Sequence, residues 1–291
     1  MSESVPPPET PEVARPVQPE QLVPSVPQPA AAPAARVRLV PSAALGAAFA
    51  RLFVLQATWN YERMQGLGLA HALSPVVKAL ERDDAAAARA LVPHTGYFNT
   101  HPVMAAVATG VVAGELEKRA AGEPALDDAG LERAKQALGS SLAAVGDPLF
   151  WNTLRPLLAL AAAAGWRDER SALGILTFVA GYNVVAIGYR IRGLFEGYRR
   201  GLAYVAHLPR RLARLTEALR LVGVVLAALV VSSILIPGGE PAPRQVLAGA
   251  VGLVLGALAF GRARLGPAEW GLALALFILA WVTIGPDGPS S

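Results

Sequence analysis

The stretch ALGILTFVAGYNVVAIGY, residues 172–189, contains 18 residues and no charged side chain. A helix that spans a bilayer needs about 20 predominantly apolar residues. Three further apolar segments follow at 221–237, 246–260 and 270–285, all near or below this length. The sequence therefore predicts an all-α, polytopic membrane protein with short and re-entrant helices, accompanied by amphipathic helices.

The composition of the whole chain agrees with a membrane protein. Of its 291 residues, 53% are hydrophobic and 16% are charged, whereas a soluble domain carries roughly 25% charge. The absence of cysteine excludes disulfide scaffolds, thiolate metal sites and cysteine nucleophiles. The net charge is +4, but the aromatic content of 7% makes a nucleic-acid surface a poor expectation.

The N-terminal region has a different composition. Residues 1–42 hold 11 of the 24 prolines and almost no periodic apolar pattern, which is typical of a disordered spacer. A docking peptide is the alternative interpretation of this tail. We expect two parts, a disordered tail over 1–42 and a membrane domain over 43–291.

Between the tail and residue 172 the patterns predict shorter helices. Residues 42–56 read as an apolar helix with Ser42 as its N-cap. Residues 76–92 and 128–138 are amphipathic, and we expect helices at or outside the membrane. Residues 103–114 are apolar but too short to span, which favours a re-entrant or buried helix.

A strongly basic segment separates the apolar segments. Residues 190–220 carry eight arginines and two glutamates, a net charge of +6. We expect a loop here, and the positive-inside rule places it in the cytoplasm. A basic surface helix without topological meaning is the alternative.

Polar residues gather in three otherwise apolar stretches. The first runs over residues 56–69, where Gln56/Asn60 and Glu62/Gln65 have the spacing of helical neighbours. The second is 94–102, and its Asn-Thr before His-Pro signals a turn or a helix start. The third is 139–156, where Gly-Asp-Pro predicts a sharp break with Asp147 as an N-cap.

These clusters contain the side chains that recognise a neutral polyol. Amides, carboxylates and arginine bind hydroxyl groups, and an aromatic ring packs on the apolar face of a sugar. The candidate pathway residues are Trp59, Asn60, Glu62, Arg63, Gln65, Asn99, Asp147, Trp151 and Arg155. Each cluster also has a structural interpretation, as a water-facing helix end, as caps, or as an Asp147–Arg155 pair, and the clusters can equally fix contacts between subunits.

Signatures of catalysis are absent from the sequence. There is no Walker A motif, no Gly-x-Ser-x-Gly, no His-Glu-x-x-His and no dinucleotide fingerprint. Two histidines seven residues apart, His94 and His101, do not define a metal site. We expect no catalytic residue, no cofactor and no metal in this chain.

At the three clusters the chain resembles the IID component of the mannose/fructose/sorbose family of the bacterial phosphotransferase system. Gln56–Leu69 follows the family pattern Q-x-S/T-W-N-[YF]-E-R-M-Q-x-L-G-F, with Leu in the last position. His94–Pro102 follows H-x-x-[FY]-F-N-T-x-P. Gly139–Pro156 follows G-P-L-A-G-[IV]-G-D-P-[IL]-F-W-x-T-x-R-P, except that its start reads Gly-Ser-Ser-Leu-Ala.

The resemblance implies a multi-pass subunit of the bacterial inner membrane. It implies that a IIC membrane subunit completes the pathway for a mannose-type hexose, and that a cytoplasmic IIAB protein phosphorylates the sugar. It further implies trimers of IIC–IID pairs in the lipid bilayer, with no nucleic-acid partner. The altered Gly139 segment and the long tail leave a second hypothesis, a non-transporting scaffold or sensor derived from the same fold.

Overall fold

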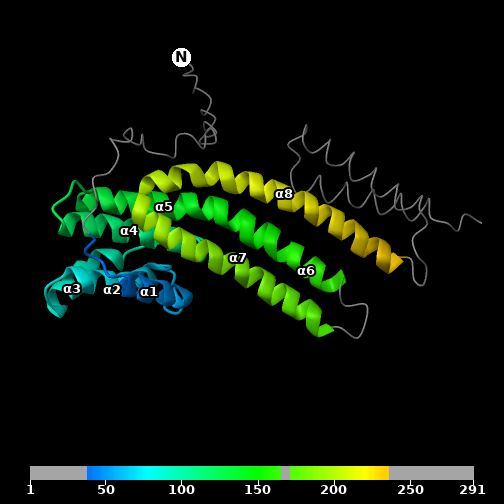
Figure 1. The fold of residues 1–291 in the computed structure, drawn as a ribbon, viewed down its shortest axis with the longest axis horizontal. Coiled ribbons are helices and arrows are strands. Elements are labelled where there is room, and N and C mark those ends of the chain that lie inside the picture. Colours follow the sequence, from blue (N-terminus) through cyan, green and yellow to red (C-terminus); the bar gives the residue numbers. More distant parts are fainter. Residues whose placement is uncertain (1–37, 165–170, 236–291) are drawn as a thin grey trace, which may run out of the picture. The chain divides into compact units, whose positions relative to one another are not determined.

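The computed structural model describes residues 38–164 and 171–235, and the regular structure of these residues is helical (Figure 1). The α-helices are α1 Ser42–Arg51, α2 Gly66–Leu80, α3 Asp84–Leu91, α4 Ala105–Ala120, α5 Asp128–Leu149, α6 Arg155–Ala164, α7 Ser171–Arg200 and α8 Leu202–Leu235. Short helical turns cover Leu52–Val54 (η2), Val92–His94 (η3) and Phe150–Leu154 (η4). The all-α prediction is confirmed for this part of the chain. Most of the tail and the segments 246–260 and 270–285 lie outside the described residues.

The chain divides into two compact units. The first unit contains the described residues up to Ala144 together with Tyr189–Pro209. The second unit contains Val145–Gly188 and the described residues from Arg210 onward. Helices α5, α7 and α8 each contribute to both units.

Helix α4 is the core of the first unit. Every residue from Ala105 to Glu115 is buried, so the apolar segment predicted over 103–114 is a buried helix. The backbone of α7 approaches it closely, because a Cβ atom at Gly110 would lie 2.2 Å from the carbonyl oxygen of Leu194. Small residues permit this kind of contact between helix backbones.

Two helix boundaries differ from the prediction. Pro41, with φ −62° and ψ 147°, is the N-cap of α1, and Ser42 is already the first helical residue. The predicted helix over 76–92 is broken after Leu80, because Asp83 starts a new helix by accepting a hydrogen bond from the Ala86 amide at 2.7 Å. The expectation that Ser42 caps the helix was therefore wrong, and a local capping residue explains the break.

The basic segment 190–220 is not a loop, which corrects the prediction. Residues up to Arg200 complete α7, and α8 begins at Leu202. Gly201 alone separates them, with φ +57°, and its amide donates to the Gly197 carbonyl at 2.8 Å. A glycine in the left-handed region is the common way to end a helix, so one residue suffices for the turn.

Gly-Asp-Pro at 146–148 does not break the chain either. Helix α5 continues through Pro148 to Leu149, and the π-helical turn η4 leads directly into α6. Thr153 donates through Oγ1 to the Pro148 carbonyl at 2.8 Å, which supplies that oxygen with a partner five residues further on. Asp147 is therefore a residue inside a helix and not an N-cap.

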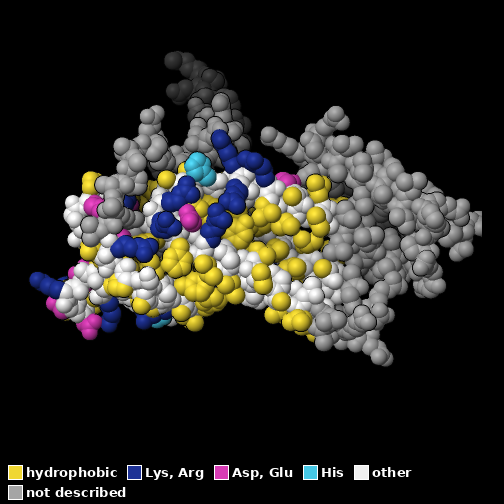
Figure 2. Space-filling model, viewed as in Figure 1, with side chains coloured by type: hydrophobic (Ala, Val, Ile, Leu, Met, Phe, Trp, Pro, Cys, Tyr) yellow, Lys and Arg dark blue, Asp and Glu magenta, His cyan; other side chains and the backbone are white. Residues whose placement is uncertain are grey.

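The second unit exposes apolar side chains. Residues Gly174–Arg200 of α7 form the one candidate membrane span among the described residues, and 11% of its most apolar window is buried. Val184 is 72% exposed, and Ile175 and Leu176 are each 59% exposed. Figure 2 shows hydrophobic side chains covering much of the visible surface of α7. Within this unit α6 packs on α7, since a Cβ at Gly181 would lie 3.0 Å from Leu158.

Candidate functional site

The first polar motif forms a turn and not a helix. Residues 55–65 fold as successive turns between η2 and α2. The Asn60 side chain closes one of them, because its Oδ1 accepts hydrogen bonds from the amides of Glu62 at 3.1 Å and Arg63 at 2.9 Å. An asparagine that bonds to the backbone just after it stabilises a turn in place of a helix. The helical spacing expected for Gln56/Asn60 and Glu62/Gln65 was therefore wrong.

The first and second motifs are bound to each other. The Gln65 side chain donates to the Thr100 carbonyl at 2.8 Å and accepts from the Thr100 amide at 3.1 Å. The Gln65 amide also donates to the Phe98 carbonyl at 2.8 Å. Met64, with φ 51°, forms isolated bridges to Asn60 and Phe98. Gln65 is 2% exposed, so both ends of its amide are used inside the protein.

Glycines make this pairing possible. A Cβ at Gly66 would lie 1.8 Å from the carbonyl oxygen of Gly96, and a Cβ at Gly68 would lie 1.8 Å from that of Leu55. The first residue of the third motif approaches the second motif in the same way, with a Cβ at Gly139 2.9 Å from the Asn99 carbonyl oxygen. The first two motifs and the start of the third thus meet in the first unit through backbone contacts.

The remaining candidates of the first unit lie on its surface. Trp59 is 41% exposed, and its ring packs edge-on against Tyr61 with 4.8 Å between centroids. Glu62 and Arg63 are exposed and form an ion pair at 3.8 Å. Asn99 is also exposed. This loop therefore offers aromatic faces, a carboxylate, a guanidinium and an amide to a ligand or a partner.

The other three candidates form a row in the second unit. Asp147, Trp151 and Arg155 follow one another at intervals of four residues, which places them on one face of the α5–η4–α6 segment. Trp151 forms a hydrogen bond with the Asp147 carboxyl group, and the Arg155 guanidinium lies 3.9 Å from the centre of the Trp151 ring. Tyr182 of α7 adds a second ring 5.6 Å from the guanidinium. The expected Asp147–Arg155 pair does not form, because Trp151 lies between them.

Arg155 has an unusual environment for a charge. Its side chain is exposed, and it has no ion-pair partner among the residues that the structure describes. It is held over an aromatic ring on a helical segment with apolar neighbours. A guanidinium in this position keeps its hydrogen-bond donors available for a ligand.

The sequence gives no indication that Glu117, a polar residue of the first unit, is buried. Glu117 is 1% exposed, and its Oε1 accepts from the amides of Leu39 at 2.9 Å and Val40 at 2.8 Å and from the Tyr198 hydroxyl at 2.6 Å. It lies in a charged sequence, Gly-Glu-Leu-Glu-Lys-Arg, that reads as a solvent-exposed helix end. Its partners Leu39, Val40 and Tyr198 lie 77 to 81 residues away in the chain, so local sequence does not predict its burial.

In the described part of the chain, no group of three or more His, Asp or Glu side chains is arranged to hold a metal ion. The candidate residues fall into two groups, one in each unit. Six candidates, including the buried Gln65, belong to the first unit, and Asp147, Trp151 and Arg155 belong to the second.

Comparison with known proteins places the chain in a family. The family described as "PTS system mannose/fructose/sorbose family IID component" matches residues 40–237. The mannose-specific EIID component of Escherichia coli K12 is 37% identical over 185 residues, which cover 62% of this chain and 65% of that protein. The sorbose-specific EIID component of Lacticaseibacillus casei is 36% identical over 178 residues, covering 61% and 62%. The chain thus matches less than two thirds of the length of these relatives, 65% and 62%.

Solved structures agree. A chain described as "Structure of membrane protein" gives a TM-score of 0.62 at 25% identity and covers 85% of this chain and 98% of that one. A chain of the mannose transporter ManYZ in complex with microcin E492 gives 0.51 at 26% identity, covering 84% and 97%. These matches confirm the all-α membrane fold. The chain belongs to the IID component family of the mannose/fructose/sorbose class of the phosphotransferase system.

Proposed function

We propose that this chain is the IID membrane subunit of a phosphoenolpyruvate-dependent sugar phosphotransferase transporter. With a IIC subunit it forms the pathway for a mannose-type hexose, and a cytoplasmic IIAB protein phosphorylates the sugar. The chain itself performs no chemical step in this proposal. Family membership over residues 40–237 and the surface described above support it.

The observation that carries the proposal is the row Asp147–Trp151–Arg155 in the second unit. A hexose is bound by donors and acceptors around its hydroxyls and by an aromatic ring against its apolar face. The row offers a carboxylate, an indole and a guanidinium on one helix face. The π-helical turn at Phe150–Leu154 lies within it, and such turns are frequent at functional sites.

The loop of the first unit has a supporting role in the proposal. Its exposed side chains Trp59, Glu62, Arg63 and Asn99 contact the sugar or the IIC subunit. Asn60 and Gln65 position this loop, because their side chains are bonded to backbone groups. The exposed rings of Trp59 and Tyr61 fit a subunit contact, since aromatic residues are enriched in interfaces.

The same proposal includes the location of the chain in the membrane and its assembly with IIC. The exposed apolar helix α7 crosses the bacterial inner membrane, and further crossings complete a multi-pass subunit. The assembly is a trimer of IIC–IID pairs in the lipid bilayer. The exposed side chains of α7 require a cover of lipid or protein, because contiguous apolar surface in water is unfavourable.

Sugar uptake into vesicles tests the function directly. Vesicles containing this chain and its IIC subunit, supplied with IIAB and phosphoenolpyruvate, should accumulate phosphorylated mannose, fructose or sorbose. Replacing Arg155 with Gln should reduce uptake roughly tenfold, the effect of losing one charge-assisted hydrogen bond. Arg133→Gln, on the exposed face of α5, is the matched control and should change uptake little.

One result would favour the scaffold hypothesis. If the IIC–IID complex is intact in the vesicles but no hexose is taken up, transport is excluded and a regulatory role remains. If uptake is normal in Arg155→Gln, transport stands but the pathway does not include this row.

A further inference from the structure

The second unit carries more positive charge than its own residues neutralise. Its described part contains two acidic residues, Asp147 and Glu217, and five arginines, Arg155, Arg210, Arg211, Arg214 and Arg220. Asp147 is hydrogen-bonded to Trp151, and Glu217 pairs with Arg220 at 3.2 Å. No acidic residue in this described part is therefore left to pair with the remaining arginines.

Three of these arginines, Arg210, Arg211 and Arg214, lie close together on α8. Each is exposed, and none has an ion-pair or hydrogen-bond partner among the residues that the structure describes. Arg210 and Arg214 are four residues apart, which makes them neighbours on one face of the helix, and Arg211 widens this face. We call these three residues the arginine cluster of α8.

The cluster lies on the side of α8 that faces away from the protein interior. Leu212 is 1% exposed and Thr216 is 4% exposed, so these two residues mark the packed side of the helix. Arg210 precedes Leu212 by two residues and Arg214 follows it by two, and two residues correspond to a rotation of about 200° around an α-helix. Both side chains are therefore accessible to a partner from outside.

The same helix becomes apolar directly after Arg220. Residues 221–235 contain no charged side chain. Leu221, Val222 and Val224 are 42%, 53% and 41% exposed, as is typical of helix residues that lipid covers. A basic segment followed by exposed apolar residues on one helix is the pattern expected where a helix leaves the hydrocarbon of a bilayer.

The distances along α8 agree with this position. At 1.5 Å per residue, Arg214 lies about 10 Å from Leu221 along the helix axis, and Arg210 lies about 16 Å from it. The headgroup region extends about 5–8 Å beyond the hydrocarbon on each side of a bilayer. The long side chain of Arg214 can therefore reach the headgroups, and a tilt of α8 brings Arg210 nearer to them.

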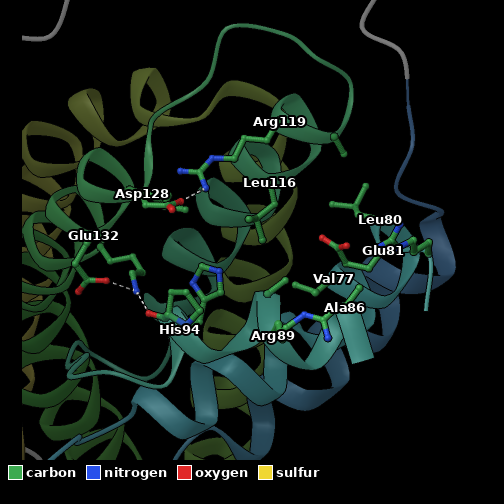
Figure 3. Close-up of a pocket in the computed structure, with 16 residues that line it drawn as sticks. Val77, Leu80, Glu81, Ala86, Arg89, His94, Leu116, Arg119, Asp128 and Glu132 are labelled. Atoms are coloured by element: carbon green, nitrogen blue, oxygen red, sulfur yellow. Dashed lines mark hydrogen bonds and ion pairs between the residues drawn. The ribbon is translucent and has the colours of Figure 1, made fainter. Parts of the chain in front are cut away.

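A cavity of the first unit shows basic residues in a different situation. Figure 3 shows this cavity, which His94 lines, with dashed lines from Arg119 to Asp128 and from Lys135 to Glu132. These ion pairs measure 2.6 and 2.5 Å. The basic side chains of these two pairs thus contribute to the fold, whereas those of the arginine cluster make no polar contact within the described chain.

We propose that the arginine cluster of α8 binds the phosphate groups of anionic phospholipids at the membrane surface. Guanidinium groups bind phosphate oxygens through paired, charge-assisted hydrogen bonds. Clusters of basic residues next to a membrane-spanning helix attract anionic lipid headgroups. An acidic protein surface is the competing partner, and lipid is favoured because the cluster shares its helix with exposed apolar residues.

The proposal rests on the membrane location included in the proposed function, and it adds a lipid specificity to that location. A bound anionic headgroup would fix the depth of α8 in the bilayer. Lipid binding is measured without sugar, IIAB or phosphoenolpyruvate. Failure of sugar uptake and failure of lipid binding are therefore distinguishable.

The test is native mass spectrometry of the full chain in a neutral detergent, which counts the lipids bound to each chain. The probes are phosphatidylglycerol and phosphatidylcholine in equal amounts, and we expect the chain to retain phosphatidylglycerol preferentially. Arg210→Gln/Arg214→Gln should weaken the binding of phosphatidylglycerol roughly thirtyfold, about fivefold for each arginine. Both residues are exposed and without a polar partner in the described chain, so this variant keeps the fold, as its melting temperature should show.

Two further variants serve as controls. Arg89→Gln/Arg133→Gln removes two exposed arginines of the first unit, so it lowers the net charge equally and should keep the preference for phosphatidylglycerol. Arg210→Lys/Arg214→Lys keeps the charge of the cluster and should retain most of the preference. Inorganic phosphate in excess should not displace the lipid.

Four results would overturn the proposal. The first is equal retention of the two lipids by the unaltered chain. The second is an equal loss of preference in Arg210→Gln/Arg214→Gln and Arg89→Gln/Arg133→Gln, which would reflect net charge alone. The third is displacement by inorganic phosphate, which would indicate a site for a soluble anion. The fourth is an unchanged lipid preference in Arg210→Gln/Arg214→Gln together with lost binding of IIAB, which would assign the cluster to an acidic protein surface.

Discussion

A methyl group at Gly68, in the first unit, would lie 1.8 Å from the Leu55 carbonyl oxygen, whereas one at Gly188, in the second unit, would meet nothing within 4 Å. These two glycines are the extremes, because Gly46 of the first unit also meets nothing within 4 Å and a Cβ at Gly174 of the second would lie 2.8 Å from the Ala162 carbonyl oxygen. The first unit has backbone segments in direct contact around a buried helix, α4. The second presents helix faces with large exposed side chains, which need lipid or a partner subunit to cover them. We therefore expect the second unit to depend more strongly on its surroundings than the first unit does.

The largest expected effect comes from adding this methyl group. Gly68→Ala should prevent the turn of residues 55–65 from packing on α2, because the atom it meets is backbone and cannot move away as a side chain would. We expect a loss of more than about 4 kcal/mol, in the range of severe overpacking. Gly188→Ala should be neutral or stabilise by about 0.5–1 kcal/mol, because glycine is a poor helix former. Melting temperature in detergent measures both, and similar values for the two variants would contradict the comparison.

The second effect tests the polar interior of the first unit. Glu117→Ala removes the acceptor of three hydrogen bonds, from Leu39, Val40 and Tyr198. We expect a loss of about 3–4 kcal/mol in the free energy of unfolding, since several buried donors are left unsatisfied. Tyr198→Phe removes one of the three bonds and should cost about 1 kcal/mol. Denaturant unfolding compares the two, and an equal loss would show that the carboxylate does not hold Leu39 and Val40.

The hydrophobic pattern of the sequence predicts much of this fold where the residues of a single helix determine its structure. The apolar run over 103–114 is too short to span a membrane, and of the two predicted outcomes, a re-entrant or a buried helix, the structure has the buried helix. Prediction failed at two local breaks. Helix α5 continues through Gly-Asp-Pro and is followed by a π-turn, and Gly201 alone ends α7 where a loop was expected.

The candidate site was only partly accessible to prediction. Residue types and spacing singled out three segments as candidates, and the structure joins two of them through Gln65 and Thr100, which lie 35 residues apart. Neither the Trp151 ring between Asp147 and Arg155 nor the cavity at His94 follows from composition. Both depend on which helix faces meet, and a single sequence does not specify that.

The third effect concerns pH and the buried His94. Burial first, and the charge of Lys135 second, lower the pKa of His94 to about 4, from 6.5 in an unfolded chain. Glu132 and Asp128 oppose this shift, and Arg119 adds to it. Above pH 6.5 both states are neutral at this group. As the pH falls from 6.5 to 4 the unfolded state binds a proton that the folded state does not, so stability decreases, by at most about 3 kcal/mol.

A variant isolates this contribution from the other titrating groups. His94→Gln should be less sensitive to acid, and the difference in unfolding free energy between it and the unaltered chain should be constant above pH 6.5 and change below. Denaturant unfolding at pH 7.5, 6.0 and 5.0 measures it. A difference that does not change across this range would mean that His94 has an ordinary pKa.

The smallest effect compares a π-turn with an α-helix inside the second unit. Thr153 and Thr216 are both buried, and each donates a side-chain hydrogen bond of 2.8 Å to a backbone carbonyl, five residues earlier for Thr153 and four for Thr216. In an α-helix the carbonyl four residues earlier already accepts from the backbone, so the hydroxyl adds little. Thr153→Val should therefore cost about 1 kcal/mol and Thr216→Val close to nothing. The melting temperatures of the two variants measure these costs. Equal decreases would mean that the Thr153 hydroxyl is not needed by the Pro148 carbonyl and that packing alone maintains the π-turn.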